Sequence, residues 1–125
     1  MYAADAFSQW LGIEIMEIGV GTCIISMTVR PEMVNGYGVA HGGITFSFAD
    51  SAFAFASNSH GRKAVSIETS ISHTRPVQVG DRLTAVAIEL NLGNTIGIYQ
   101  VVVKNQDNKT VALFKGNVFR SGEIM

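Results

Sequence analysis

The hydrophobic pattern of the chain changes sharply at one stretch, residues 41–57. From Ile44 to Ser57 most residues are Phe, Ala or small hydroxyl residues, and no polar face repeats with the helical period. A helix that is apolar on all sides is a buried helix. At this length it would reach only about 24 Å, too short to cross a membrane. We therefore expect one central helix that the rest of the chain surrounds.

Segments with the period of a β-strand lie on both sides of this helix. Before it, residues 12–30 predict two antiparallel strands joined at Gly19–Gly21, and residues 31–40 predict a loop. Residues 3–10 suit a short helix that covers one end of the domain. After the central helix, strands separated by turn residues are expected at 64–76, 83–90, 95–103 and 110–119.

The order of these elements predicts an α+β fold in a single domain, residues 1–125. One helix followed by a long antiparallel meander indicates a curved sheet of five to six strands that wraps the helix. In residues 64–76, the positions of Val65 and Ile67 alternate with those of Ser66 and Glu68, and the alternation continues along the segment. This period of two predicts a strand with one face inward. The other sheet face also carries apolar residues, so we expect it to pack against a second copy.

The composition excludes several classes of protein. The chain has a net charge of −1 and no basic stripe, so no nucleic-acid partner is expected. Its composition, with 47% hydrophobic and 15% charged residues, is more apolar than that of a typical soluble monomer and indicates an oligomer interface. Cys23, the only cysteine, excludes an internal disulfide and is expected in the core. The N-terminus has no signal-peptide pattern, so we expect a cytoplasmic protein without a membrane partner.

Two features of the central stretch point to chemistry. Gly42 and Gly43 leave the backbone bare at the start of the helix, where unpaired N–H groups and the helix dipole favour a negatively charged oxygen. Asp50 is the only charged residue on the helix. A carboxylate on a helix without a polar face needs a partner or a function, because burying it unpaired costs free energy.

Other kinds of site find no support in the sequence. No G-x-S-x-G elbow, P-loop or G-x-G-x-x-G motif is present, and the three histidines are scattered without metal-ligand spacing. Gly42 and Asp50 remain as a pair, in which Gly42 N–H would stabilise an oxyanion and Asp50 would act as nucleophile or base. Eight residues of helix separate them by about 12 Å, so one chain cannot apply both to one substrate. Two copies whose helices run antiparallel could apply Gly42 of one copy and Asp50 of the other to the same substrate.

Structural alternatives remain open for each of these residues. The glycines could form a tight turn, and Asp50 could be a buried carboxylate tied to backbone or hydroxyl groups. His41 could make only a local hydrogen bond, since the sequence shows no acid to orient it. Asn35 could be only a turn residue.

Several motifs together resemble one enzyme family. Residues Asn35–Gly43 (NGYGVAHGG) and Phe48–Ala52 (FADSA) are similar to the signature of hot-dog-fold acyl-CoA thioesterases, especially the PaaI type of phenylacetate degradation. The resemblance covers almost the whole chain and extends to Arg75-Pro76, Gly80-Asp81 and Thr110–Gly116 (TVALFKG).

This resemblance implies a role for each candidate residue. Asp50 would attack the thioester or activate water, and the Gly42 N–H of the partner subunit would polarise the thioester carbonyl. His41 and Asn35 match supporting positions near the thioester and the leaving sulfur, and Ser66 matches a hydroxyl that holds the attacking water in some relatives, although it could be a surface serine. The family implies a homo-oligomer, a dimer of dimers, and no metal or cofactor apart from the coenzyme A of the substrate.

Two departures from the family pattern limit what can be transferred. His73 and Thr74 stand where many relatives have an aromatic residue and a leucine, and the turn at residues 92–95 lacks a lysine often found there. Residues that contact the coenzyme A nucleotide therefore stay unassigned. The resemblance implies hydrolysis of an aryl- or arylacetyl-CoA, such as phenylacetyl-CoA or hydroxyphenylacetyl-CoA. A non-catalytic acyl-CoA-binding module and a hot-dog hydratase or dehydratase are the alternatives.

Overall fold

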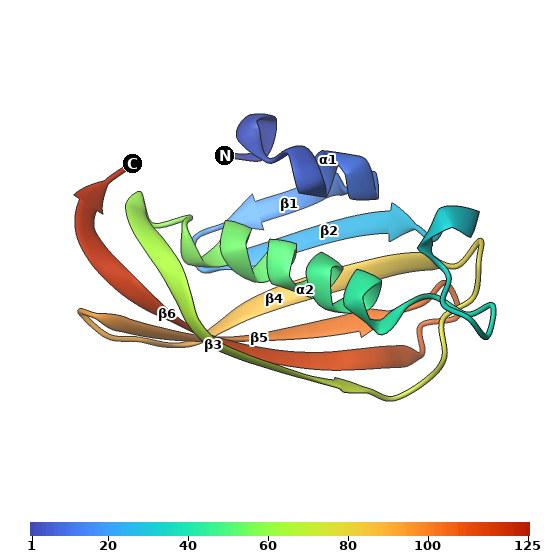
Figure 1. Cartoon of the computed structure of the whole chain (residues 1–125). Helices are drawn as coiled ribbons and strands as arrows, with labels where there is room; N and C mark the ends of the chain where they lie inside the picture. Colours follow the sequence, from blue (N-terminus) through green and yellow to red (C-terminus); the bar gives the residue numbers. More distant parts are fainter.

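The computed structural model describes residues 1–125 as one curved sheet wrapped around one long helix (Figure 1). The two helices are α1 and α2, the six strands are β1 to β6, and two short 3-10 turns are η1 and η2. In chain order the elements are η1 Tyr2–Ala4, α1 Ala6–Leu11, β1 Glu14–Gly19, β2 Thr22–Thr28, η2 Pro31–Met33, α2 Gly42–Ser57, β3 Arg62–His73, β4 Arg82–Leu92, β5 Ile96–Lys104 and β6 Thr110–Ile124.

Helix α2 is the buried centre of the fold, as the hydrophobic pattern predicts. Phe48 is 0% and Phe53 is 1% exposed, and both belong to a core that the strands complete. The helix starts after His41, whose Nδ1 accepts the N–H of Gly43 at 2.8 Å. It ends at Asn58, whose side-chain amide donates to the carbonyl of Ala54 at 2.9 Å. No helix is long and apolar enough to span a bilayer.

The sheet has the strand order β1-β2-β4-β5-β6-β3, and the pairs are antiparallel. The expected single meander is correct only for β4, β5 and β6. Strand β3 pairs with β6 at the far edge, because β2 occupies the place beside β4 that a continuous meander would give to β3. Residues 74–81, which contain Pro76, carry the chain from the edge strand β3 past β6 and β5 to β4.

No single face of β3 points inward along its whole length, contrary to the expectation from its alternation. Val65 and Ile67 are 43% and 55% exposed. The pairing register with β6 shifts after Ser66, and such a bulge exchanges the two faces of a strand. Ser66 lies opposite the buried Val118, so it shares the side of the sheet that covers α2. Beyond the shift, Ile71 packs against the core.

The outer face of the sheet keeps a large apolar surface. Exposed apolar side chains stand on strands β4, β6 and β3, within the four neighbouring strands β4-β5-β6-β3, and they include Ile88, Leu113, Phe119 and Val65. An apolar surface on adjacent strands is typical of a protein interface. That a second copy covers it stays a prediction.

Candidate active site

The first turn of α2 presents an unpaired backbone amide at Gly42. The N–H of Gly43 is taken by the His41 side chain at 2.8 Å, and that of Ile44 by the His41 carbonyl at 2.9 Å. The N–H of Gly42 has no acceptor within the chain. An unpaired amide at the positive end of a helix dipole is a ready donor to an anionic oxygen. His41 thus makes a local hydrogen bond to Gly43 and leaves the Gly42 amide free to donate to a ligand.

Gly42 lines a pocket of about 280 Å³ together with the end of β3. A Cβ atom placed on Gly42 would lie 3.4 Å from His73 Nε2, so the imidazole is the nearest side chain to this glycine. Arg75 and Thr45 also line the pocket, and no carboxylate does. The pocket is therefore rich in hydrogen-bond donors and suits an oxygen-bearing ligand.

Asn35 holds the turn that leads to the helix. Its Oδ1 accepts the N–H of Tyr37 at 2.8 Å and that of Val39 at 3.4 Å. Its backbone N–H also donates to the carbonyl of Val39 at 2.8 Å. Asn35 is thus a turn residue, as the structural alternative from the sequence predicted. The side-chain NH₂ makes no hydrogen bond within the chain, which leaves it as a donor for a ligand.

Asp50 lies in the middle of α2 and is half-buried. Its carboxylate makes no hydrogen bond and no ion pair within the chain. Asp50 is therefore not a structural carboxylate held by backbone or hydroxyl groups, which was the alternative left open by the sequence. Burial raises the pKa of Asp50, and the negative charge of Asp5 raises it further. A desolvated carboxylate without partners has the properties expected of a base or nucleophile.

The structure brings some of the candidate residues together and keeps others apart. His41 and Gly42 are neighbours at the start of α2, and the Asn35 turn adjoins them. Asp50 is about 12 Å further along the helix of the same chain. Ser66 stands on β3 with an exposed side chain and no hydrogen-bond partner for its hydroxyl. A single chain thus separates the proposed oxyanion donor from the proposed acid.

Two neighbours of these residues were missed by the sequence analysis. His73 was noted only as a departure from the family pattern, and its place beside Gly42 in the pocket depends on how β3 passes the start of α2. Asp5 was not considered at all. The aspartate three residues before Ser8 is a helix-cap signal, but no local pattern could indicate that α1 packs against α2 at Ser51, next to Asp50.

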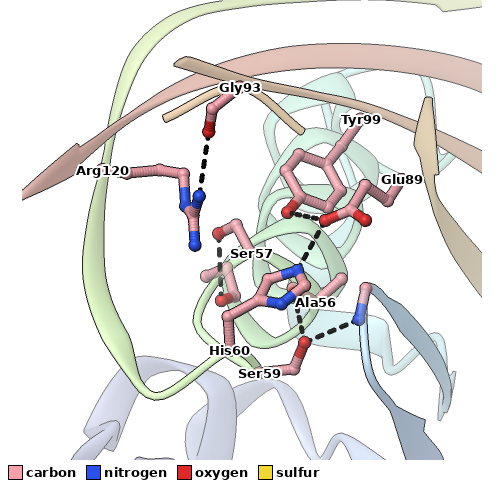
Figure 2. A network of polar contacts seen from close by, with 10 residues as sticks. Ala56, Ser57, Ser59, His60, Glu89, Gly93, Tyr99 and Arg120 are labelled. Atoms are coloured by element: carbon pink, nitrogen blue, oxygen red, sulfur yellow. Dashed lines mark hydrogen bonds and ion pairs between the residues drawn. The ribbon is translucent and has the colours of Figure 1, made fainter. Parts of the chain in front are cut away.

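A second polar cluster lies at the other end of α2 (Figure 2). Glu89 Oε1 accepts the Tyr99 hydroxyl at 2.6 Å and lies 2.6 Å from His60 Nε2. Ser59 Oγ accepts the N–H of Gly21 at 2.7 Å. Burial acts to raise the pKa of Glu89, but the bonds from Tyr99 and His60 and nearby positive charge outweigh it and lower this pKa. The bonds of His60 and Tyr99 to Glu89 connect the helix end to β4 and β5, and the bond of Ser59 connects it to the β1–β2 turn.

No group of three or more His, Cys, Asp or Glu side chains is arranged to hold a metal ion. Cys23 is fully buried on β2, as expected, and burial raises the pKa of its thiol to about 11. A buried thiol that stays protonated is not a nucleophile at neutral pH.

Comparisons with known proteins agree with the motifs. The family model described as Thioesterase superfamily matches residues 37–112, more than half of the chain. Acyl-coenzyme A thioesterase PaaI of Escherichia coli is 44% identical over 98% of this chain and 87% of its own length. A putative esterase of Archaeoglobus fulgidus is 46% identical over 98% of this chain and 80% of its own.

Solved structures give the same result. The structure of E. coli PaaI, from the phenylacetic acid degradation operon, superposes with a TM-score of 0.97 over 99% of this chain and 90% of that one. A Streptococcus mutans protein solved with acetyl-CoA bound is 28% identical, with a TM-score of 0.87 over 90% of this chain and 91% of that one.

Proposed function

Because the chain belongs to the thioesterase superfamily and has its hot-dog fold, we propose that it hydrolyses acyl-CoA thioesters to the free acid and coenzyme A. The acyl group is an aryl or arylacetyl group, of the phenylacetyl-CoA or hydroxyphenylacetyl-CoA type. The operon of the E. coli relative supports this substrate class, and the acetyl-CoA bound to the S. mutans protein supports coenzyme A as the carrier. No further cofactor takes part.

One observation supports the proposal most strongly. The same helix carries an unpaired amide at Gly42 and an unpaired, desolvated carboxylate at Asp50, about 12 Å apart. Neither group has a structural partner that would account for it. In a two-fold dimer with antiparallel helices, Gly42 of one subunit faces Asp50 of the other, and two equivalent sites result.

The chemistry follows from these two groups. As a base, Asp50 takes a proton from water, whose oxygen adds to the thioester carbonyl carbon. As a nucleophile, its own oxygen adds to that carbon, and water then hydrolyses the resulting anhydride. In both routes the carbon–sulfur bond breaks and coenzyme A leaves as the thiolate. The Gly42 N–H binds the carbonyl oxygen, whose negative charge develops in the transition state, so this bond accelerates the reaction.

The remaining candidate residues support the reacting groups. His41 fixes the first turn of α2 and lies next to the thioester, and the free amide of Asn35 donates toward the thioester or the leaving sulfur. Ser66, on the sheet side that covers the helix, holds the attacking water. The dimer is the catalytic unit, and the apolar outer face of the sheet supports further assembly to a tetramer.

The first experiment measures free thiol released from a panel of acyl-CoAs. Phenylacetyl-CoA should be hydrolysed faster than acetyl-CoA, and Asp50→Asn should lower turnover by about two or more orders of magnitude. Asp107→Asn, in an exposed turn, is the matched control and should behave as wild type. Near-normal turnover in Asp50→Asn would refute the assignment. Tight binding without hydrolysis would favour the binding module, and activity on an enoyl-CoA would favour the hydratase.

The second experiment tests the shared site. Gly42→Pro removes the N–H at the first helical position, where proline is well tolerated, and His41 already has the extended conformation that proline requires before it. Gly42→Ala adds a Cβ but keeps the N–H. Gly42→Pro should be inactive and Gly42→Ala should retain most activity.

Mixing the two inactive variants then tests whether each site draws on both subunits. A dimer of one Gly42→Pro and one Asp50→Asn subunit contains one intact site. Equal mixing after dissociation should therefore restore about a quarter of wild-type activity. If both groups acted within one chain, no activity would return.

A further inference from the structure

The N-terminal segment packs firmly against α2. Leu11 is fully buried, and the Tyr2 hydroxyl donates to the carbonyl of Ile13 at 2.6 Å. The Tyr2 ring meets Phe55 of α2 edge-on, with centroids 6.0 Å apart. Figure 1 shows α1 on the side of α2 that faces away from β4, β5 and β6. The segment therefore forms a fixed wall beside the central helix.

A short chain of hydrogen bonds joins α1 to the middle of α2. Asp5 caps α1, since its Oδ1 accepts the Ser8 N–H at 3.0 Å and its Oδ2 accepts the Ser8 hydroxyl at 2.6 Å. The Ser8 oxygen lies 2.8 Å from the Ser51 hydroxyl oxygen. Because Ser8 gives its hydrogen to Asp5, Ser51 donates to Ser8. Both serines are buried, 1% and 8% exposed, so this chain is shielded from water.

This chain of hydrogen bonds links Asp5 to the residue next to Asp50. Ser51 directly follows Asp50 on the helix, and neither α1 nor α2 carries a further charged residue. Among titratable groups on the surrounding strands, His73 lies beside the helix start, and Tyr99 is bonded to Glu89. Asp5 is the one charged group that perturbs Asp50, and it acts in the same direction as burial, raising the pKa. No positive charge counteracts this effect of Asp5 on the pKa of Asp50.

We propose that Asp5 is a positioning residue for Asp50: its carboxylate, held through Ser8 and Ser51, places a fixed negative charge on the side of α2 that carries the reacting carboxylate. This inference rests on the thioesterase function proposed above. A fixed negative charge nearby disfavours the ionised form of Asp50, so the ionised group binds a proton more strongly and is a better base or nucleophile. A cap alone would not require this charge, because Asn and Ser cap helices about as well as Asp.

The test separates the charge of Asp5 from its role as a cap. Asp5→Asn keeps an acceptor for the Ser8 N–H and removes the charge. The acidic limb of its kcat/KM profile should move to lower pH, and turnover on the plateau should fall several-fold. The melting temperature at pH 7 should stay at or above that of wild type. Asp5→Glu, which keeps the charge, should keep the acidic limb near the wild-type position.

An acidic limb that stays in place in Asp5→Asn would overturn the proposal and leave Asp5 as a helix cap. If Asp5→Asn does not fold, Asp5→Ser, another neutral cap, replaces it with the same two outcomes. A substrate-free readout compares the melting temperatures of wild type and Asp50→Asn across pH. The pH at which the two curves separate should fall when Asp5→Asn is added to both proteins. If the curves still separate at the same pH, the proposal is also overturned.

The failure of this inference differs from a failure of the proposed function. Activity in Asp50→Asn would remove the catalytic role of Asp50, whatever Asp5→Asn does. An inactive Asp50→Asn combined with an unmoved acidic limb in Asp5→Asn would remove only the role of Asp5.

Discussion

The contact between Gly116 and Phe53 predicts a large effect from one added methyl group. Gly116 lies on β6 and faces the ring of Phe53 on α2. A Cβ at Gly116 would lie 2.7, 2.8 and 2.9 Å from three atoms of that ring. Carbon atoms in ordinary contact are about 3.5–4.0 Å apart. Gly116→Ala therefore forces the ring to retreat by about 0.8 Å or more.

The ring has little room to retreat. Phe53 is 1% exposed, and its centroid lies 5.8 Å from that of Tyr99 and 5.5 Å from that of Phe114. Overpacking a core by one methyl group costs about 1–3 kcal/mol. The gain of about 0.4–1 kcal/mol that Gly→Ala gives by restricting the unfolded chain offsets part of this. We expect a net loss of about 1–2 kcal/mol in the free energy of unfolding.

Thermal unfolding followed by circular dichroism measures this loss. An unfolding entropy of about 2.1 cal/mol/K per residue converts 1 kcal/mol into about 4 °C for this chain, so the melting temperature should fall by about 4–8 °C. Gly122→Ala, on the same strand with nothing within 4 Å of its Cβ, is the matched control and should not melt earlier than wild type. Protein concentrations must be equal, because assembly shifts the midpoint. Equal midpoints for the two variants would refute the packing argument.

Two further substitutions test charges through stability measured in urea at several pH values. The pKa of Glu89 is lowered, so its contribution is present above the unfolded-state value and lost as pH falls through the folded-state value. Glu89→Gln should be less stable than wild type at pH 7 by about 1.5–3 kcal/mol and converge with it in acid, whereas the exposed control Glu123→Gln should differ little. The pKa of Asp50 is raised, so its ionised form costs stability as pH rises through the folded-state value. Asp50→Asn should be more stable than wild type at pH 7, with the difference lost in acid, and equal stability throughout would contradict the desolvation of Asp50.

Local patterns in the sequence were sufficient for the elements and for part of the site. The apolar run after Gly43 predicted α2, since a helix without a polar face has to be buried. Alternation and turn residues located the strands to within a few residues, although β3 starts earlier and β6 runs further than expected. Gly42 and Gly43 stood out as a glycine pair at the start of an apolar helix, and Asp50 stood out as its only charged residue. The motif resemblance added Asn35 and Ser66, whose roles stay predictions.

Only the tertiary structure decided which distant residues meet. Segments far apart in the chain meet in the pairing of β3 with β6, in the pocket that His73 and Gly42 both line, and in the hydrogen bond between Ser8 and Ser51. The exchange of faces after Ser66 also depends on this pairing. Periodicity records which face of an element is apolar, because each residue contributes to it locally. It does not record which element covers that face, since this depends on the packing of the whole chain. The sequence alone therefore determined a buried helix with a carboxylate and a bare amide, while the folded chain determined the charges and donors that surround them.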